Sequence, residues 1–183
     1  NLLALLFSTQ STAAAQTHAF HELPVVSADL LERPITLQSG IAHAHDTVGT
    51  SSPEAQKFYD QGLTYLHHFE WIQAARSFNQ ALRLDARLAL ALAGISTAQV
   101  ELNQSTAARA TFARARALIS SLSEHDRRHL EIADLRLAAL ADSSRISAYR
   151  EALDDAIVRF PKDAELLLER GVAESPDIND RGQ

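Results

Sequence analysis

Residues 55–88 read AQKFYDQGLTYLHHFEWIQAARSFNQALRLDARL, and the prediction of the fold starts from them. Small and large apolar residues recur in this stretch three or four positions apart, the spacing that places side chains on one face of a helix. The pattern breaks at Phe69–Glu70, so we expect two helices joined by a short turn. The recurring positions are Phe58, Gly62, Tyr65, Ala74, Phe78 and Ala81.

The second half of this pattern returns 34 residues further along the chain, with Ser96 in the place of Gly62. The repeated positions are Ala108, Phe112 and Ala115. A fixed period near this length, with small residues where two helices meet, is the signature of the tetratricopeptide repeat (TPR). The chain therefore resembles this family. The resemblance implies an all-α fold, a right-handed superhelical array of antiparallel helix pairs with about seven helices.

The resemblance places the repeat array at residues 53–174. The third repeat begins later than the period requires, and we expect a lengthened helix reaching Ser120 and a linker to hold the excess. The final half repeat has no second helix to cover its leucines and Val172, so an alternative is that the chain is the N-terminal fragment of a longer TPR protein. The repeats are expected at about 55–88, 89–122, 130–163 and, for the half repeat, 164–174.

The small residues of the pattern have a packing role in such an array. Gly62 and Ala81 are expected where the two helices of a pair approach closely, because a larger side chain would wedge them apart. The ring of Phe78 is expected to fill the space around these contacts. We therefore predict that Gly62→Leu destabilises the fold more than its position inside a helix would suggest.

The residues before the array divide into two segments. The apolar run at 2–7, followed by Ala13-Ala14-Ala15, makes residues 1–15 similar to the end of a secretory signal peptide and predicts export to the periplasm or cell surface. The alternative is an extra N-terminal helix that caps the array. Residues 16–52 contain scattered prolines and glycines and are expected to form an irregular N-terminal arm. At the other end, residues 175–183 read as a polar tail.

Helix-start signals are clear in the array. Ser52 is a suitable N-cap and Pro53 a suitable first helical residue, while Ser123 and Asp163 are expected to cap later helices.

The segment from His43 to Gly62 also resembles the opening of a group of exported bacterial repeat proteins, most of which have no assigned activity. Membership of that group would imply a scaffold in the bacterial envelope.

Composition excludes several classes of function. The formal net charge is −6 and no segment is strongly basic, which argues against a nucleic-acid interface. The sequence contains no cysteine, so disulfides, thiolate metal sites and a cysteine nucleophile are excluded for these residues. The motifs of serine hydrolases, P-loop proteins, zinc proteases and dinucleotide-binding proteins are missing from the sequence, and we expect no enzyme activity and no catalytic residues.

TPR proteins bind partners in the groove lined by the first helices of their repeats. The chaperone-binding branch holds a terminal carboxylate there with lysine and asparagine, whereas this chain has apolar residues in the groove. An apolar groove suits an amphipathic helix or an extended apolar segment of a protein partner. The alternative is that the chain's own arm, residues 16–50, or its apolar run fills the groove. The expected groove residues are Tyr59, Leu63, Leu66, His67, Leu90, Ala93 and Thr97.

Histidines suggest a second function. His43 and His45 lie two positions apart, and His67 or His68 from the end of the first helix would complete a Zn or Cu site. The alternative is that these four side chains are solvated or face the groove, and that the chain has no cofactor.

A second histidine pair, His125 and His129, is one helical turn apart, which also suits a metal. Its charged neighbours at 126–128 favour a solvated helix face instead.

From all these features we expect a non-enzymatic protein–protein interaction scaffold of the bacterial envelope that works within a larger complex. The alternatives are a histidine-based Zn or Cu module or a fragment of a longer repeat protein.

Overall fold

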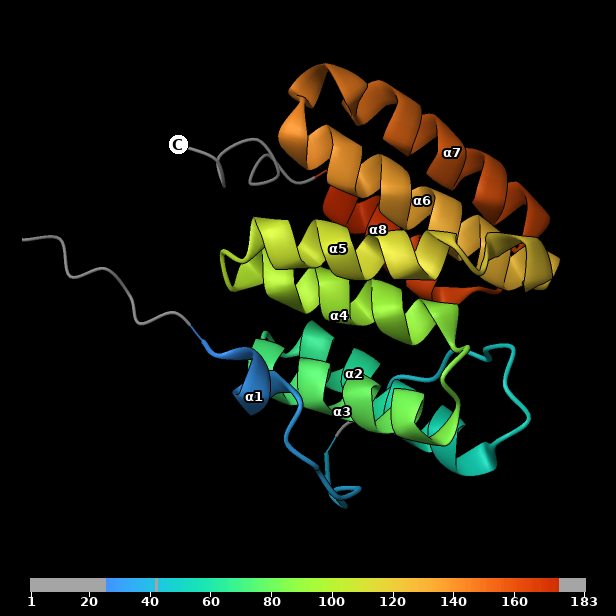
Figure 1. The fold of residues 1–183 in the computed structure, drawn as a ribbon. Helices are drawn as coiled ribbons and strands as arrows, with labels where there is room; N and C mark the ends of the chain where they lie inside the picture. Colours follow the sequence, from blue (N-terminus) through green and yellow to red (C-terminus); the bar gives the residue numbers. More distant parts are fainter. Residues whose placement is uncertain (1–25, 42, 175–183) are drawn as a thin grey trace, which may run out of the picture.

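The computed structural model describes residues 26–41 and 43–174, and this part of the chain is all-helical, without a strand (Figure 1). The predicted all-α class is confirmed. The seven predicted helices of the array are present, and an eighth lies in the arm. The helices are α1 (Ala28–Leu31), α2 (Pro53–His67), α3 (Trp71–Leu84), α4 (Ala89–Glu101), α5 (Ser105–Arg116), α6 (Glu124–Ala141), α7 (Ile146–Arg159) and α8 (Ala164–Ala173), with 3-10 turns η1 (Ile119–Ser121) and η2 (Ser143–Arg145).

Helices that follow one another in the chain pack against one another. The pairs α2–α3, α4–α5 and α6–α7 are in contact, α3 also contacts α4, and α8 packs on α7. Figure 1 shows the three pairs side by side in chain order, with α4–α5 in the middle. The α4 helix also contacts α6, which joins the middle pair to the last one.

Polar side chains begin three of the helices where the sequence predicted them. Ser52 Oγ accepts a hydrogen bond from the backbone N–H of Ala55 at 3.1 Å, with Pro53 as the first helical residue of α2. The Ser123 hydroxyl and the Asp163 carboxylate cap α6 and α8 in the same way. Such caps satisfy backbone donors that have no partner within the helix, so they fix where each helix begins.

The fully buried ring of Phe78 joins three helices. A Cβ placed on Gly62 of α2 would lie 2.5 Å from this ring, and a Cβ placed on Gly94 of α4 would lie equally close. The ring therefore fills the space that two missing side chains leave between α2, α3 and α4. The close approach expected at Gly62 is confirmed, and Gly94 is a second contact of the same kind that the repeat pattern did not predict.

The connection between α5 and α6 differs from the prediction. The expected lengthening of α5 is wrong, because that helix ends at Arg116 and is followed by the turn η1. Three apolar residues of this connection, Leu118, Ile119 and Leu122, pack against the central core. Their burial favours a turn that folds back on the core over a helix that continues into solvent.

The described part of the arm lies along α3 and α2. Within it, α1 is a single helical turn that the sequence prediction missed, capped by the hydroxyl of Ser27. Side chains on α3 donate hydrogen bonds to backbone carbonyls at the end of α1 and just after it. Asn79 donates to Leu31 at 3.0 Å. Arg83 donates to Glu32, and Arg76 donates to Arg33. These bonds satisfy backbone acceptors that an irregular segment cannot satisfy internally.

Two segments with sequence predictions, residues 1–15 and 175–183, lie outside the described residues. Among the helices of the described part, none has the length and apolar character to cross a membrane.

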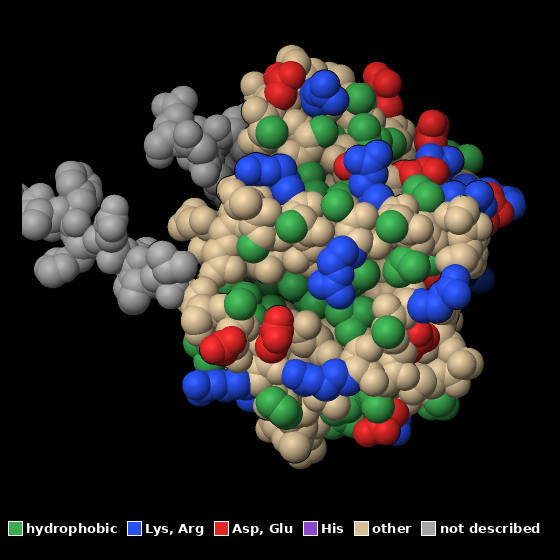
Figure 2. Space-filling view, in the orientation of Figure 1, with side chains coloured by type: hydrophobic (Ala, Val, Ile, Leu, Met, Phe, Trp, Pro, Cys, Tyr) green, Lys and Arg blue, Asp and Glu red, His purple; other side chains and the backbone are tan. Residues whose placement is uncertain are grey.

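The sequence predicts that the leucines of α8 and Val172 are uncovered. Leu166 is instead fully buried, whereas Leu167, Leu168 and Val172 are each about half exposed. Figure 2 shows basic, acidic and apolar side chains interspersed on one face of the molecule.

Candidate functional site

A cavity of about 340 Å³ opens between four helices. Its walls come from α2, α4, α6 and α8, together with the turn that joins α2 to α3 and the first residue of α3, Trp71. None of the described arm residues lines it, although residues 16–25 of the arm and the apolar run lie outside the described part. All seven predicted groove residues do line it: Tyr59, Leu63, Leu66, His67, Leu90, Ala93 and Thr97.

The cavity has a buried apolar floor and a more exposed apolar edge. Tyr59, Leu63 and Leu90 belong to the floor and are almost fully buried. At the edge, Phe69 is 69% exposed and meets the Trp71 ring edge to face at 5.5 Å. On the opposite wall, Leu168 and Val172 of α8 are about half exposed. Exposed apolar side chains beside a concave apolar surface are typical of a binding site.

Charged side chains surround this apolar surface. His67 Nε2 lies 3.0 Å from Glu165 Oε2, so the end of α2 contacts the start of α8 across the cavity. The hydrogen bond to Glu165 raises the pKa of His67, and burial opposes this only in part. Glu101 and Arg136 form a second pair at 3.7 Å. With Glu169, the lining has three carboxylates and a single arginine.

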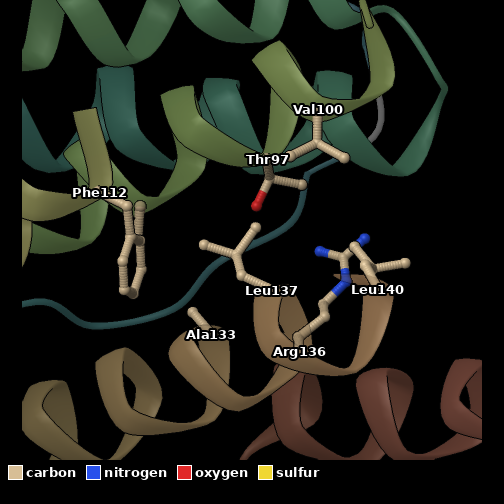
Figure 3. Close-up of a pocket in the computed structure, with 8 residues that line it drawn as sticks. Thr97, Val100, Phe112, Ala133, Arg136, Leu137 and Leu140 are labelled. Carbon is tan, nitrogen blue, oxygen red and sulfur yellow. The ribbon is translucent and has the colours of Figure 1, made fainter. Parts of the chain in front are cut away.

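A second gap lies beside this cavity between α4, α5 and α6 (Figure 3). The side chains of Leu137, Phe112 and Thr97 point toward it, and its volume is about 10 Å³. A water molecule needs about that much space and also needs two or more polar partners. The gap is therefore a small packing defect rather than a ligand site.

The four histidines predicted to bind Zn or Cu do not form a ligand group. His45 Nδ1 lies 2.7 Å from Asp60 Oδ2, while His67 pairs with Glu165. His43 and His68 are exposed. Only one set of three or more histidine and carboxylate side chains in residues 26–41 and 43–174 brings its ligand atoms within 4.8 Å of one another, and it contains none of these four.

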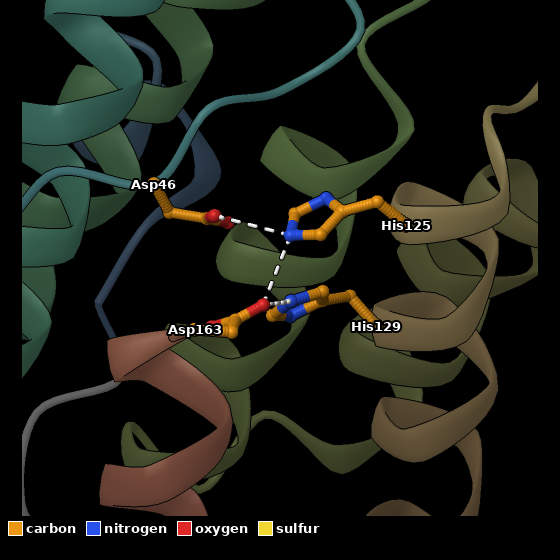
Figure 4. Close-up of side chains that lie close together, drawn as sticks. All are labelled: Asp46, His125, His129 and Asp163. Carbon is orange, nitrogen blue, oxygen red and sulfur yellow. Dashed lines mark hydrogen bonds and ion pairs between the residues drawn. The ribbon is translucent and has the colours of Figure 1, made fainter. Parts of the chain in front are cut away.

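That set consists of Asp46, His125, His129 and Asp163 (Figure 4). Asp163 Oδ2 lies 2.9 Å from His125 Nε2 and 2.7 Å from His129 Nε2. Asp46 Oδ1 lies 3.5 Å from His125 Nε2. The expectation of a solvated face is wrong for both histidines, because their side chains are only 25% and 10% exposed. We call this set the His–Asp cluster.

Three segments that are far apart in the sequence build the His–Asp cluster. The arm supplies Asp46 just before α2, the first two turns of α6 supply both histidines, and Asp163 is the N-cap of α8. His125 and His129 are four residues apart on one helix, so both rings reach the same side. Their ring centroids are 4.5 Å apart, and the edge of the His125 ring also meets Phe160.

Burial and the mutual charge interactions of the four side chains shift the pKa values in the cluster. Burial raises the pKa of Asp46 to about 6, although the nearby histidines act to lower it. Burial also acts to raise the pKa of Asp163, but its hydrogen bonds and its charge interaction with the histidines outweigh burial and lower it to about 2. For His129, burial acts to lower the pKa, and Asp163 and Asp46 together raise it.

Sequence reasoning missed the two carboxylates of the cluster. The signal available was the pair His125 and His129 with helical spacing. The sequence predicts only a capping role for Asp163, which the structure confirms, but its second oxygen faces the histidines. Asp46 lies in an irregular segment where no periodicity could reveal its neighbours.

Comparison with known proteins gives no matching family model, no significant match to a characterised protein and none to a solved structure.

Proposed function

We propose that the chain is a non-enzymatic scaffold that binds a segment of a partner protein in the cavity between α2, α4, α6 and α8. The observation that supports this most directly is that the seven residues expected to face a binding groove all line that one cavity. The tetratricopeptide arrangement is part of the same proposal. Helix pairs that lie in chain order, with the first helix of each pair lining a common surface, agree with what the resemblance implies.

The occupant we propose is an amphipathic helix with basic residues beside its apolar face. The floor at Tyr59, Leu63 and Leu90 would bury apolar side chains of such a helix. The edge residue Phe69 offers an aromatic contact of the kind that dominates many interfaces. The carboxylates around the cavity outnumber its arginine, so lysine or arginine on the partner would meet favourable charge.

The setting we propose is an assembly in the bacterial envelope. It rests on the signal-like character of residues 1–15 and on the resemblance of the segment from His43 to Gly62 to exported repeat proteins. The apolar floor and the lack of an enzyme motif in the sequence both favour binding over catalysis.

A direct test uses the purified chain against a displayed library of helical peptides. We expect enrichment of peptides with apolar residues three and four positions apart and with lysine or arginine at the flanks. Binding of an enriched peptide should weaken more than about tenfold in Leu63→Glu, since a buried charge in the floor opposes burial of an apolar side chain. The matched control is Leu84→Glu, because Leu84 is a partly exposed leucine outside the cavity.

Other occupants would give different results in the same experiment. Peptide binding that appears only after residues 1–15 are removed would show that the apolar run fills the cavity. A concentration-dependent dimer that Leu63→Glu dissociates would show that a second copy fills it. Enriched peptides that bind Leu63→Glu as tightly as the parent chain would overturn the groove proposal.

A further inference from the structure

We propose that the His–Asp cluster binds one divalent transition-metal ion of the Zn²⁺ class, which joins the arm to α6 and α8. This site is separate from the partner-binding function proposed above. It also differs from the set of histidines that the sequence suggested, since it uses Asp46, His125, His129 and Asp163.

The donor set suits such an ion. Two imidazole nitrogens and two carboxylate oxygens are ligands that Zn²⁺ accepts, usually in four-coordinate geometry with bonds of about 2.0–2.2 Å. In tetrahedral geometry with these bonds, the donor atoms around one ion lie about 3.3–3.6 Å apart. The four donor atoms of the cluster already lie within 4.8 Å of one another, so small side-chain movements would bring them to bonding distance.

The second observation is a buried carboxylate oxygen without a partner. Asp46 is only 7% exposed, and its Oδ2 atom has no hydrogen-bond partner among the described residues. Its other oxygen lies 3.5 Å from His125 Nε2, which is long for a hydrogen bond. A buried carboxylate with so little compensation is costly, and buried polar groups normally have a partner. A cation in the cluster would supply the missing interaction.

A third observation concerns the orientation of His125. Its Nδ1 lies 3.2 Å from Oδ1 of Asp126, while its Nε2 faces Asp163. Asp126 is itself buried, and its Oδ2 accepts the backbone N–H of Gly49 at 2.8 Å. A carboxylate that binds the outer nitrogen of a histidine fixes the ring and leaves the other nitrogen free for a metal, which is the usual arrangement around metal-binding histidines.

Hydrogen bonding within the cluster does not account for all of its features. Protonated histidines sharing Asp163 would explain the two short contacts to its Oδ2. They would leave Asp46 Oδ2 buried and unpaired. An ion that takes both histidine Nε2 atoms and both carboxylates accounts for all four side chains together.

The experiment measures Zn²⁺ binding by the purified full chain, first stripped of metal by chelation. We expect uptake of one equivalent of Zn²⁺ and a rise in melting temperature on adding it. Co²⁺ should compete with Zn²⁺ and give the visible absorption of a four-coordinate site. In Asp46→Asn and His129→Gln we expect the affinity to fall more than about 100-fold, since these residues are direct ligands and even the loss of an outer partner costs about 10–100-fold. In Asp126→Asn, which removes an outer partner, we expect the Zn²⁺ affinity to fall by about 10–100-fold.

Two controls keep the result interpretable. The double variant His43→Gln/His68→Gln removes two exposed histidines outside the cluster and should bind Zn²⁺ as the parent does. Asp46 lies outside the helices, and without metal the Asp46→Asn variant should be about as stable as the parent, because it removes a buried carboxylate whose Oδ2 atom has no hydrogen-bond partner.

Three results would overturn the proposal. One is the absence of saturable Zn²⁺ uptake by the folded parent chain. Another is uptake that Asp46→Asn and His129→Gln leave unchanged. The third is uptake that the His43→Gln/His68→Gln variant abolishes.

Discussion

The ring of Phe78 lies directly against the α-carbon of Gly62, and a Cβ added there would be 2.5 Å from the ring. Gly94 lies against the opposite edge of the same ring, and a Cβ added to it would also be 2.5 Å from the ring. Because Phe78 is fully buried, neither glycine can gain a side chain without moving the ring or the helices.

Gly62→Ala is therefore expected to destabilise the fold, although alanine is the better helix former. Overpacking of a filled core costs about 1–3 kcal/mol, which exceeds the gain of about 0.5–1 kcal/mol from replacing glycine inside a helix. The free energy of unfolding in urea measures the difference. The matched control is Gly171→Ala in α8, where a Cβ would meet nothing within 4 Å. It should be neutral or stabilising, and a loss of stability equal to that of Gly62→Ala would contradict the close contact.

Phe78→Ala tests the same contact from the other partner. Removing a fully buried ring should lower the free energy of unfolding by about 3–5 kcal/mol, because a cavity remains between α2, α3 and α4. Phe69→Ala is the comparison, since Phe69 is 69% exposed and its loss should change stability by about 0.5 kcal/mol or less. Similar losses for both variants would show that Phe78 does not hold the helices together.

The helices of this chain were predictable because their signals are local. The caps at Ser52, Ser123 and Asp163 and the periodic apolar residues between them depend only on nearby residues. The contact of Gly62 with Phe78 was also predictable, since both lie in one helix pair. Gly94 was missed because its contact with Phe78 crosses from one pair to the next, where the repeat pattern placed the small position at Ser96 instead.

The sites were less predictable than the helices. The seven groove positions followed from the expected role of first helices, and they do meet at one cavity. The His–Asp cluster depends on where an irregular segment crosses α6, and no sequence spacing encodes that crossing. The superhelical TPR arrangement and binding of a partner both stay predictions.

The pair formed by His67 and Glu165 should make stability depend on pH. The hydrogen bond to Glu165 raises the pKa of His67 above 6.5, so the folded chain holds this proton more tightly than the unfolded chain. The resulting stabilisation is fully present below pH 6.5 and is lost as pH rises through the folded-state pKa. The difference between the parent and His67→Gln, measured in urea with a chelator present, should shrink as the pH rises above 6.5.

That difference should be no more than about 1 kcal/mol, since the His67 side chain is about one-third exposed. Glu165→Gln is the control and should remove the same part of the pH dependence. A parent–variant difference that is constant with pH, or that grows as pH rises, would contradict the assigned ion pair.

Gln61 of α2 is expected to hold the arm in place. This side chain is only 5% exposed, accepts the backbone N–H of Gln38 at 2.7 Å and donates to the carbonyl of Thr36 and the hydroxyl of Ser77. Gln61→Leu keeps most of the volume but leaves these groups unpaired, so it should lower stability by about 1–3 kcal/mol. Hydrogen exchange should rise first at residues 34–41, because this segment has no helix of its own.

The matched control for that variant is Lys57→Leu, an exposed position on the same helix. It adds the same side chain without touching the arm and should change stability by about 0.5 kcal/mol or less. If exchange in Gln61→Leu rose equally over the whole chain, the residue would support the helix pair in general. A local rise confined to residues 34–41 would show that the arm opens separately from the helices, as expected of a segment without a helix of its own that Gln61 helps to hold.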